Sequence, residues 1–177
     1  MKNVNVIAPV NNLGYGVASI NICKALSRRD IRVSLFPIGQ PSFSCEQEAL
    51  DVGPMIQSQG SFDPKAPCLK IWHEHSMGER VGKGKFVGFP FFEIDTFDAP
   101  RKNHLSSCDE IAVSCEWAKK IVEKEVPDST VHSVPLGVDT SVFTALPPTK
   151  SDKFTFFNCG KWEKRKGHDL LINLFTE

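Results

Sequence analysis

Short apolar runs alternate with helical segments along most of this chain, and each run is bounded by Gly, Pro or polar residues. Such alternation is typical of a parallel sheet covered by helices, because parallel strands need a crossover connection between them. We therefore expect an α/β fold with a parallel sheet flanked by helices. The expected strands span residues 4–10, 32–37, 68–73, 86–92, 110–114 and 131–135. The expected helices span residues 17–29, 46–57 and 115–124, and residues 99–107 are expected to form a short helix or a turn.

A further strand, turn and helix are expected near the C-terminal end of the sequence. Residues 153–160 read KFTFFNCG and predict a buried strand, residues 161–167 predict a basic turn, and residues 168–177 predict the start of an amphipathic helix. The prolines in residues 146–151 indicate a linker. We expect a first domain over residues 1–150 and the truncated opening of a second over residues 151–177, since roughly 27 residues are too few for a domain.

The composition is that of an ordinary globular chain. Of the 177 residues, 41% are hydrophobic and 24% are charged, and the formal net charge is zero. This balance gives no global attraction for nucleic acid, and no run approaches the roughly 20 apolar residues that span a bilayer. The six cysteines form no CxxC pair, so we expect them to be reduced, buried residues of a cytoplasmic protein, with peripheral membrane attachment left open.

A loop with two glycines follows the first expected strand. Residues 11–16 read Asn-Asn-Leu-Gly-Tyr-Gly, and a helix is expected directly after them. Gly14 and Gly16 would let the backbone approach a ligand closely, and the free amides at a helix start favour an anion. The alternative is a plain tight turn, because the third glycine of a dinucleotide-binding fingerprint is absent.

His73, Glu74 and His75 follow the third expected strand, at the edge where open α/β sheets bind ligands. Histidine can act there as a base or a hydrogen-bond donor. Alternate residues of an extended backbone point in opposite directions, so we expect only one of the two histidines to face the cleft. The alternative is a histidine satisfied by a backbone carbonyl. These three residues are the only clustered metal ligands, and we expect no metal site.

Charged side chains follow two other expected strands. Glu93 opens an acidic segment that also holds Asp95 and Asp98, where a carboxylate could bind sugar hydroxyls or take a proton. The alternative is a solvated acidic loop. Four cations lie between residues 153–160 and the last helix, and they suit a diphosphate unless they form only a solvated turn. These cations are Lys161, Lys164, Arg165 and Lys166.

Three segments together resemble a family of glycosyltransferases with the GT-B fold, which has two Rossmann-like domains. Residues 134–143, VPLGVDTSVF, resemble that family's NGVD…F crossing between the two domains. Residues 156–171, FFNCGKWEKRKGHDLL, resemble its VGRLxxxKG…LL opening of the donor domain. Residues 109–118, DEIAVSCEWA, resemble a strand and helix of its first domain. The family is the large "group 1" type, also called family 4.

The resemblance implies a retaining, metal-independent transferase without a cofactor. In it, the second domain holds a nucleotide-sugar donor, and the first, Rossmann-like domain holds the acceptor. Lys161 and Lys166 match the two cations that hold the donor's diphosphate, and Arg165 lies between them. His73 best matches the histidine beside the transferred sugar, with His75 as the rival. Gly14, Tyr15 and Gly16 match the first-domain glycine loop, and Glu93 matches a residue near the acceptor.

Two functions remain open at this stage. The first is a glycosyltransferase that acts on a glycan, a lipid-linked sugar or a protein, present here as a fragment that we expect to be inactive alone. The family's late glutamate pair has no counterpart in the 177 residues. The second is a non-catalytic Rossmann-like binding module that forms a homodimer or pairs with a partner chain through residues 153–177, because an unpaired strand invites such pairing.

Overall fold

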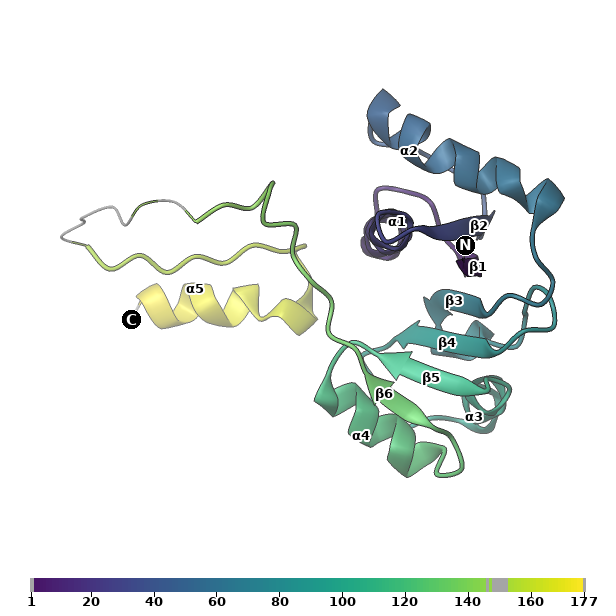
Figure 1. The fold of residues 1–177 in the computed structure, drawn as a ribbon. Helices are drawn as coiled ribbons and strands as arrows, with labels where there is room; N and C mark the ends of the chain where they lie inside the picture. The colour runs from purple at the N-terminus through teal and green to yellow at the C-terminus, as the bar shows by residue number, and fades with distance from the viewer. Residues whose placement is uncertain (1, 146, 148–152, 177) are drawn as a thin grey trace. The chain divides into compact units, whose positions relative to one another are not determined.

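The computed structural model describes residues 2–145, 147 and 153–176, which form two compact units over residues 1–137 and 138–177 (Figure 1). The first unit contains a six-stranded sheet in the order β2-β1-β3-β4-β5-β6. Its strands are β1 Lys2–Ala8, β2 Ile31–Pro37, β3 Cys68–His73, β4 Phe86–Phe91, β5 Glu110–Val113 and β6 Val131–Ser133. Its helices are α1 Gly14–Ser27, α2 Glu46–Gln57, α3 Ala99–Ser106 and α4 Glu116–Glu125, with short 3-10 turns η1 Ser58–Ser61 and η2 Glu74–Ser76.

Every pairing in the sheet is parallel, so the predicted Rossmann-like α/β fold is confirmed. The six strands lie where the apolar runs predict them, within a few residues at each end. The chain adds β2 on one side of β1 and then crosses back to add β3 on the other side. This reversal makes the β1–β3 pair the topological switch point, where doubly wound sheets bind ligands at the carboxyl ends of the strands.

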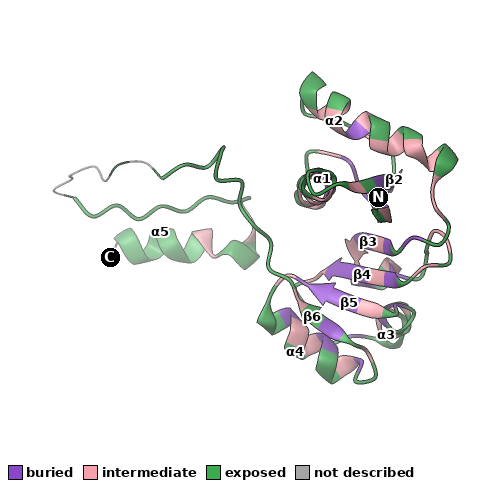
Figure 2. Cartoon of the chain, in the orientation of Figure 1, coloured by how far each residue is buried: buried purple, intermediate pink, exposed green. Residues whose placement is uncertain are grey.

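Both faces of the sheet are covered, and the alternation of residues along the strands explains how. In β1, Ile7 belongs to one buried cluster, which also contains residues of α3 and α4. Its neighbours Val6 and Ala8 belong to the other cluster, which contains residues of α1 and α2. Successive strand residues point to opposite faces, so an almost continuous apolar strand can serve two helical layers. Figure 2 shows the buried residues concentrated in the strands, with smaller buried patches on α2 and α4.

Two predicted helix starts are wrong. The first helix begins at Gly14 rather than Val17, so Gly14, Tyr15 and Gly16 form its first turn instead of a loop. The helix predicted over residues 115–124 begins one residue later, at Glu116, and Cys115 before it makes no side-chain capping bond. Three cysteines also contradict the expected burial. Cys45 and Cys115 are exposed at the positions before α2 and α4, and Cys159 is exposed in the second unit.

The second unit contains one 3-10 turn and one helix among its described residues. The turn is η3 Lys164–Lys166, and helix α5, His168–Thr176, confirms the predicted helix. Gly167 joins them with a φ of 67°, a left-handed conformation that glycine adopts without strain. The strand predicted over residues 153–160 is wrong, because this segment is assigned no strand and pairs with none in the described part of the chain. The predicted linker at 146–151 lies outside the described residues apart from Pro147.

Among the residues that the structure describes, no helix is both long enough and apolar enough to cross a membrane.

Candidate functional site

Tyr15 and His73 meet at the carboxyl edge of β1 and β3. Tyr15 lies in the first turn of α1, directly after β1, and His73 is the last residue of β3. The Tyr15 hydroxyl oxygen lies 2.9 Å from Nδ1 of His73 and donates to the carbonyl oxygen of Phe91 at 2.7 Å. Phe91 is the register partner of His73 on β4. Three elements therefore converge on one hydroxyl group at the switch point of the sheet.

Aromatic rings surround this hydroxyl and hold it in place. The ring centroid of Tyr15 lies 5.3 Å from that of Trp72 and 5.3 Å from that of Phe91. Trp72 in turn packs edge-on against His73 with the centroids 4.9 Å apart. Aromatic pairs at these separations add to the stabilisation from burial. The Tyr15 and His73 side chains are thus fixed by packing as well as by hydrogen bonds.

His75 lies on the same side as His73, contrary to the prediction that only one histidine faces the cleft. Their rings stack with centroids 5.0 Å apart and planes 19° from parallel. The prediction assumed an extended backbone, but β3 ends at His73 and the chain turns into η2. In a 3-10 turn the side-chain period is three residues instead of two, so positions 73 and 75 are no longer opposed.

Glu74 anchors the turn that carries His75. Its carboxylate is buried, with 5% of the residue exposed, and accepts a hydrogen bond from Nε of Arg101 at 2.9 Å. Arg101 also pairs with Asp98, which caps the N-terminus of α3 by accepting from the Arg101 backbone amide. The pKa of Arg101 is raised, first by its bond to Glu74 and further by the negative charge of Asp98. This network ties η2 to α3, and it explains Asp98 as a structural residue.

The surroundings of His73 and Tyr15 keep the imidazole and the phenol neutral near pH 7. Burial lowers the pKa of His73, and the neighbouring His75 lowers it further, against a smaller opposing effect of Glu74. Burial raises the pKa of Tyr15 to about 12, with added repulsion from Glu74 and Glu93. Glu93 is exposed, and its negative charge lies close enough to Tyr15 to raise the pKa of that hydroxyl.

The first turn of α1 provides free backbone donors beside this cluster. The first amides of a helix have no acceptor within the helix, and no acidic residue lies in this turn. A helix start of this kind can bind an anion. Gly14 has open space around it, whereas a Cβ on Gly16 would lie 2.1 Å from the Asn11 carbonyl oxygen. The glycine at position 16 is therefore required by the loop before the helix, as in the tight-turn alternative.

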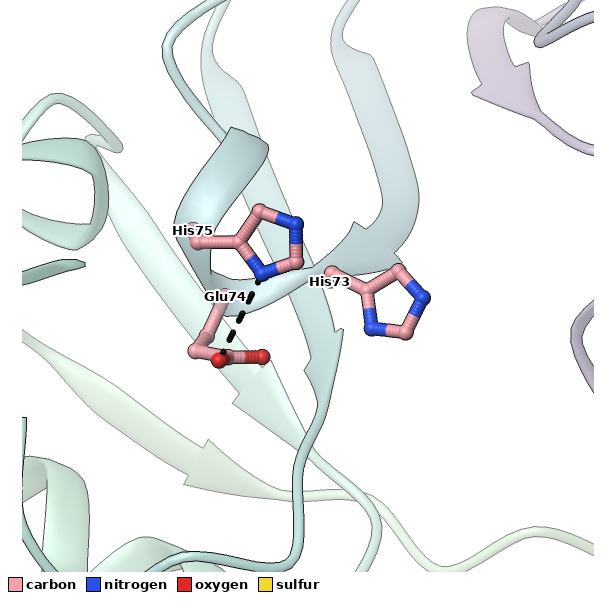
Figure 3. A group of neighbouring side chains, drawn as sticks. All are labelled: His73, Glu74 and His75. Carbon is pink, nitrogen blue, oxygen red and sulfur yellow. Dashed lines mark ion pairs between the residues drawn. The ribbon is translucent and has the colours of Figure 1, made fainter.

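His73, Glu74 and His75 are close enough to be considered as metal ligands. Their donor atoms lie within 4.8 Å of one another (Figure 3). However, a metal must lie near the plane of each imidazole ring, and stacked rings direct their lone pairs side by side rather than toward a common point. The Glu74 carboxylate is also committed to Arg101. The arrangement suits hydrogen bonding better than metal binding.

The predicted diphosphate-binding cations all lie in the second unit. Lys161, Arg165 and Lys166 are exposed, and Arg165 pairs with Glu163 at 3.1 Å. His168 organises their turn, since its Nε2 lies 2.9 Å from the carbonyl oxygen of Lys161 and its ring stacks on Trp162 with centroids 5.2 Å apart.

Sequence reasoning singled out Tyr15, His73 and His75 but missed the groups that hold them. Trp72 and the Phe91 carbonyl have no recognisable motif, because each is one residue of an apolar strand. Arg101 is paired with a residue 27 positions away, and no local pattern signals such a pair.

The chain matches no protein-family model, and no curated protein matches it.

Proposed function

We propose that the first unit is the acceptor-binding domain of a retaining, metal-independent glycosyltransferase of the GT-B type. The observation that carries the proposal is the meeting of Tyr15 and His73 at the switch point of a parallel sheet. Doubly wound sheets bind their ligands at this place. The three resembling segments of the sequence then favour a sugar transferase over other proteins with such a sheet.

In the proposed reaction, the bond between the anomeric carbon and the diphosphate oxygen of a nucleotide sugar breaks. An acceptor hydroxyl oxygen bonds that carbon, and its proton leaves with the nucleoside diphosphate. Lys161 and Lys166 would offset the negative charge that develops on the diphosphate, which is electrostatic stabilisation of the transition state. His73 would lie beside the transferred sugar. Gly14 and Gly16, His75 and Glu93 would lie near the donor or acceptor.

Binding of nucleotide sugars tests the proposal directly. The full chain, labelled with ¹⁵N, is titrated with nucleotide sugars that carry uridine, guanosine or adenosine diphosphate, and the chemical shifts of the amides are recorded. We expect weak, saturable shifts in residues 161–168 for at least one of these donors. We expect much smaller shifts with the corresponding nucleosides, because the phosphates supply the charge that the lysines recognise.

Two variants provide the matched control. Lys166→Ala should abolish the shifts, whereas Lys164→Ala removes an equal charge from the same turn and should leave most of the binding. Equal losses in the two variants would mean that the turn attracts anions without a defined site. Inorganic phosphate producing the same shifts as every donor would have the same meaning, and either result would contradict the proposal.

A second candidate is a non-catalytic module that associates with another chain through residues 153–176. Large apolar side chains in this segment favour it. Phe154 is 85% exposed, Phe157 is 88% exposed, and the apolar residues of α5 are largely exposed within the described residues. Sedimentation equilibrium should then give a dimer that Phe154→Ser with Phe157→Ser converts to a monomer. A monomer at all concentrations would exclude the homodimer and leave only a different partner chain.

A further inference from the structure

Three groups form a short chain of hydrogen bonds at the candidate site. The Phe91 carbonyl oxygen lies 2.7 Å from the Tyr15 hydroxyl oxygen, which lies 2.9 Å from Nδ1 of His73. Both distances are those of well-formed hydrogen bonds. The three groups come from β4, α1 and β3, so the chain of bonds spans the carboxyl edge of the sheet.

The number of available protons determines which group donates each of these hydrogen bonds. A carbonyl oxygen can only accept, so the Tyr15 hydroxyl must give its single proton to Phe91. The same hydroxyl then has only lone pairs to offer His73, and Nδ1 of His73 must carry the proton between them. A neutral imidazole has one N–H, so Nε2 is left with a lone pair.

We propose that Tyr15 is a positioning residue that holds neutral His73 in the Nδ1–H tautomer. His73 then presents Nε2 as a hydrogen-bond acceptor and base toward a ligand group that donates a hydrogen bond. The inference follows from the geometry alone, and it stands whether or not the domain belongs to a glycosyltransferase.

The surroundings are consistent with this assignment. The charged and titratable groups that act on the pair are Glu74, Glu93 and His75. Burial and the two carboxylates raise the pKa of Tyr15 to about 12, so the phenol keeps the proton that it donates to Phe91. Burial and His75 lower the pKa of His73, so the ring is neutral at pH 7 and above, where its tautomer matters.

The Tyr15 ring has little freedom to turn its hydroxyl elsewhere. It packs against the rings of Trp72 and Phe91. This role parallels that of a carboxylate that orients a catalytic histidine, with the difference that the phenol adds no negative charge.

Nuclear magnetic resonance can read the tautomer directly. The full chain is labelled with ¹⁵N-histidine, and two-bond ¹H–¹⁵N correlations are recorded at about pH 8, above the ordinary histidine pKa of about 6.5. His73→Gln identifies the His73 signals among the five histidines. Free imidazole side chains favour the Nε2–H form in water. We expect His73 to show the Nδ1–H pattern instead, and an Nε2–H pattern in the wild-type protein would overturn the proposal.

Two variants separate the hydroxyl's effect from that of packing. Tyr15→Phe keeps the ring against Trp72 but removes the acceptor, so the Nε2–H fraction of His73 should rise several-fold. Ser19→Ala removes a different hydroxyl from the same helix, and it should leave the tautomer unchanged. If His73 keeps the Nδ1–H form in a folded Tyr15→Phe variant, another group holds the proton and Tyr15 has no positioning role.

Discussion

Two phenylalanine-rich segments of this chain differ completely in their burial. Strand β4 reads FVGFPF, with Phe86 and Phe89 exposed by only 1% and 4%. Residues 154–157 read FTFF, yet Phe154 and Phe157 are exposed by 85% and 88%. Both segments precede a helix and both predict a buried strand.

The comparison shows that apolar composition does not by itself make a strand. Strand β4 is bonded on both edges, to β3 and β5, and has a helical layer on each face. Residues 153–160 have no strand partner among the residues that the structure describes. The ring of Phe156 contacts those of Phe154 and of Phe175 in α5. Backbone pairing and coverage of both faces come from other parts of a fold, and a local sequence pattern cannot supply them.

The largest expected contrast is in thiol reactivity. Burial raises the pKa of the Cys23 thiol to about 12, whereas Cys159 in the second unit is exposed. A buried thiol reacts only after local opening, so we expect Cys23 to react with Ellman's reagent about 10³-fold more slowly than Cys159. Native protein should show three fast and three slow thiols, in line with the exposed and buried cysteines. Six fast thiols would contradict the packing of the first unit, and Cys159→Ser should remove one fast thiol.

Truncation of one phenylalanine in each segment tests the comparison in terms of stability. Phe86→Ala should lower the free energy of unfolding by about 3–5 kcal/mol, because it opens a cavity in the core. Phe157→Ala should change it by less than about 0.5 kcal/mol, as for an exposed surface residue. Urea unfolding followed by circular dichroism measures both. Similar losses in the two variants would mean that Phe157 is covered in solution.

Glycine substitutions should give a smaller contrast of the same kind. In Gly16→Ala the new Cβ would lie 2.1 Å from the Asn11 carbonyl oxygen, a clash with backbone, and we expect a loss of about 1–3 kcal/mol. In Gly160→Ala the nearest atom is Nε2 of His168 at 3.7 Å, an ordinary contact, and we expect less than about 0.5 kcal/mol. The same urea titrations apply. An unchanged free energy of unfolding in Gly16→Ala would show that the loop before α1 can move away from the new methyl group at little cost.

The smallest expected effect is a pH dependence of the free energy of unfolding that arises from His73 in the first unit. The pKa of His73 is lower in the folded protein than its ordinary value of 6.5, so the unfolded chain binds the proton first as pH falls. His73 therefore makes the free energy of unfolding rise with pH from its folded pKa up to about 6.5, and contributes no slope above that. Unfolding titrations between about pH 5 and 8 should show a shallower slope in His73→Gln. An unchanged slope would show that His73 does not titrate differently on folding.

Local patterns were sufficient for much of the fold. The apolar runs and their spacing predicted all six strands of the parallel sheet, because residues buried on both faces leave a continuous apolar signal. The same pattern placed His73 at the end of β3, where a ligand site is expected in such a sheet. The start of α1 was missed by three residues because glycines in a first helical turn look like a loop in sequence.

Only the tertiary structure decided how the site is assembled. Tyr15 and His73 are 58 positions apart and meet because β1 and β3 are neighbours in the sheet. The stacking of His73 on His75 depends on the backbone leaving its extended form at Glu74, and Arg101 holds that turn from a helix 27 residues away. A sequence pattern reports the period and burial of one segment at a time. Contacts between segments depend on sheet order and register, which arise only when the whole unit packs.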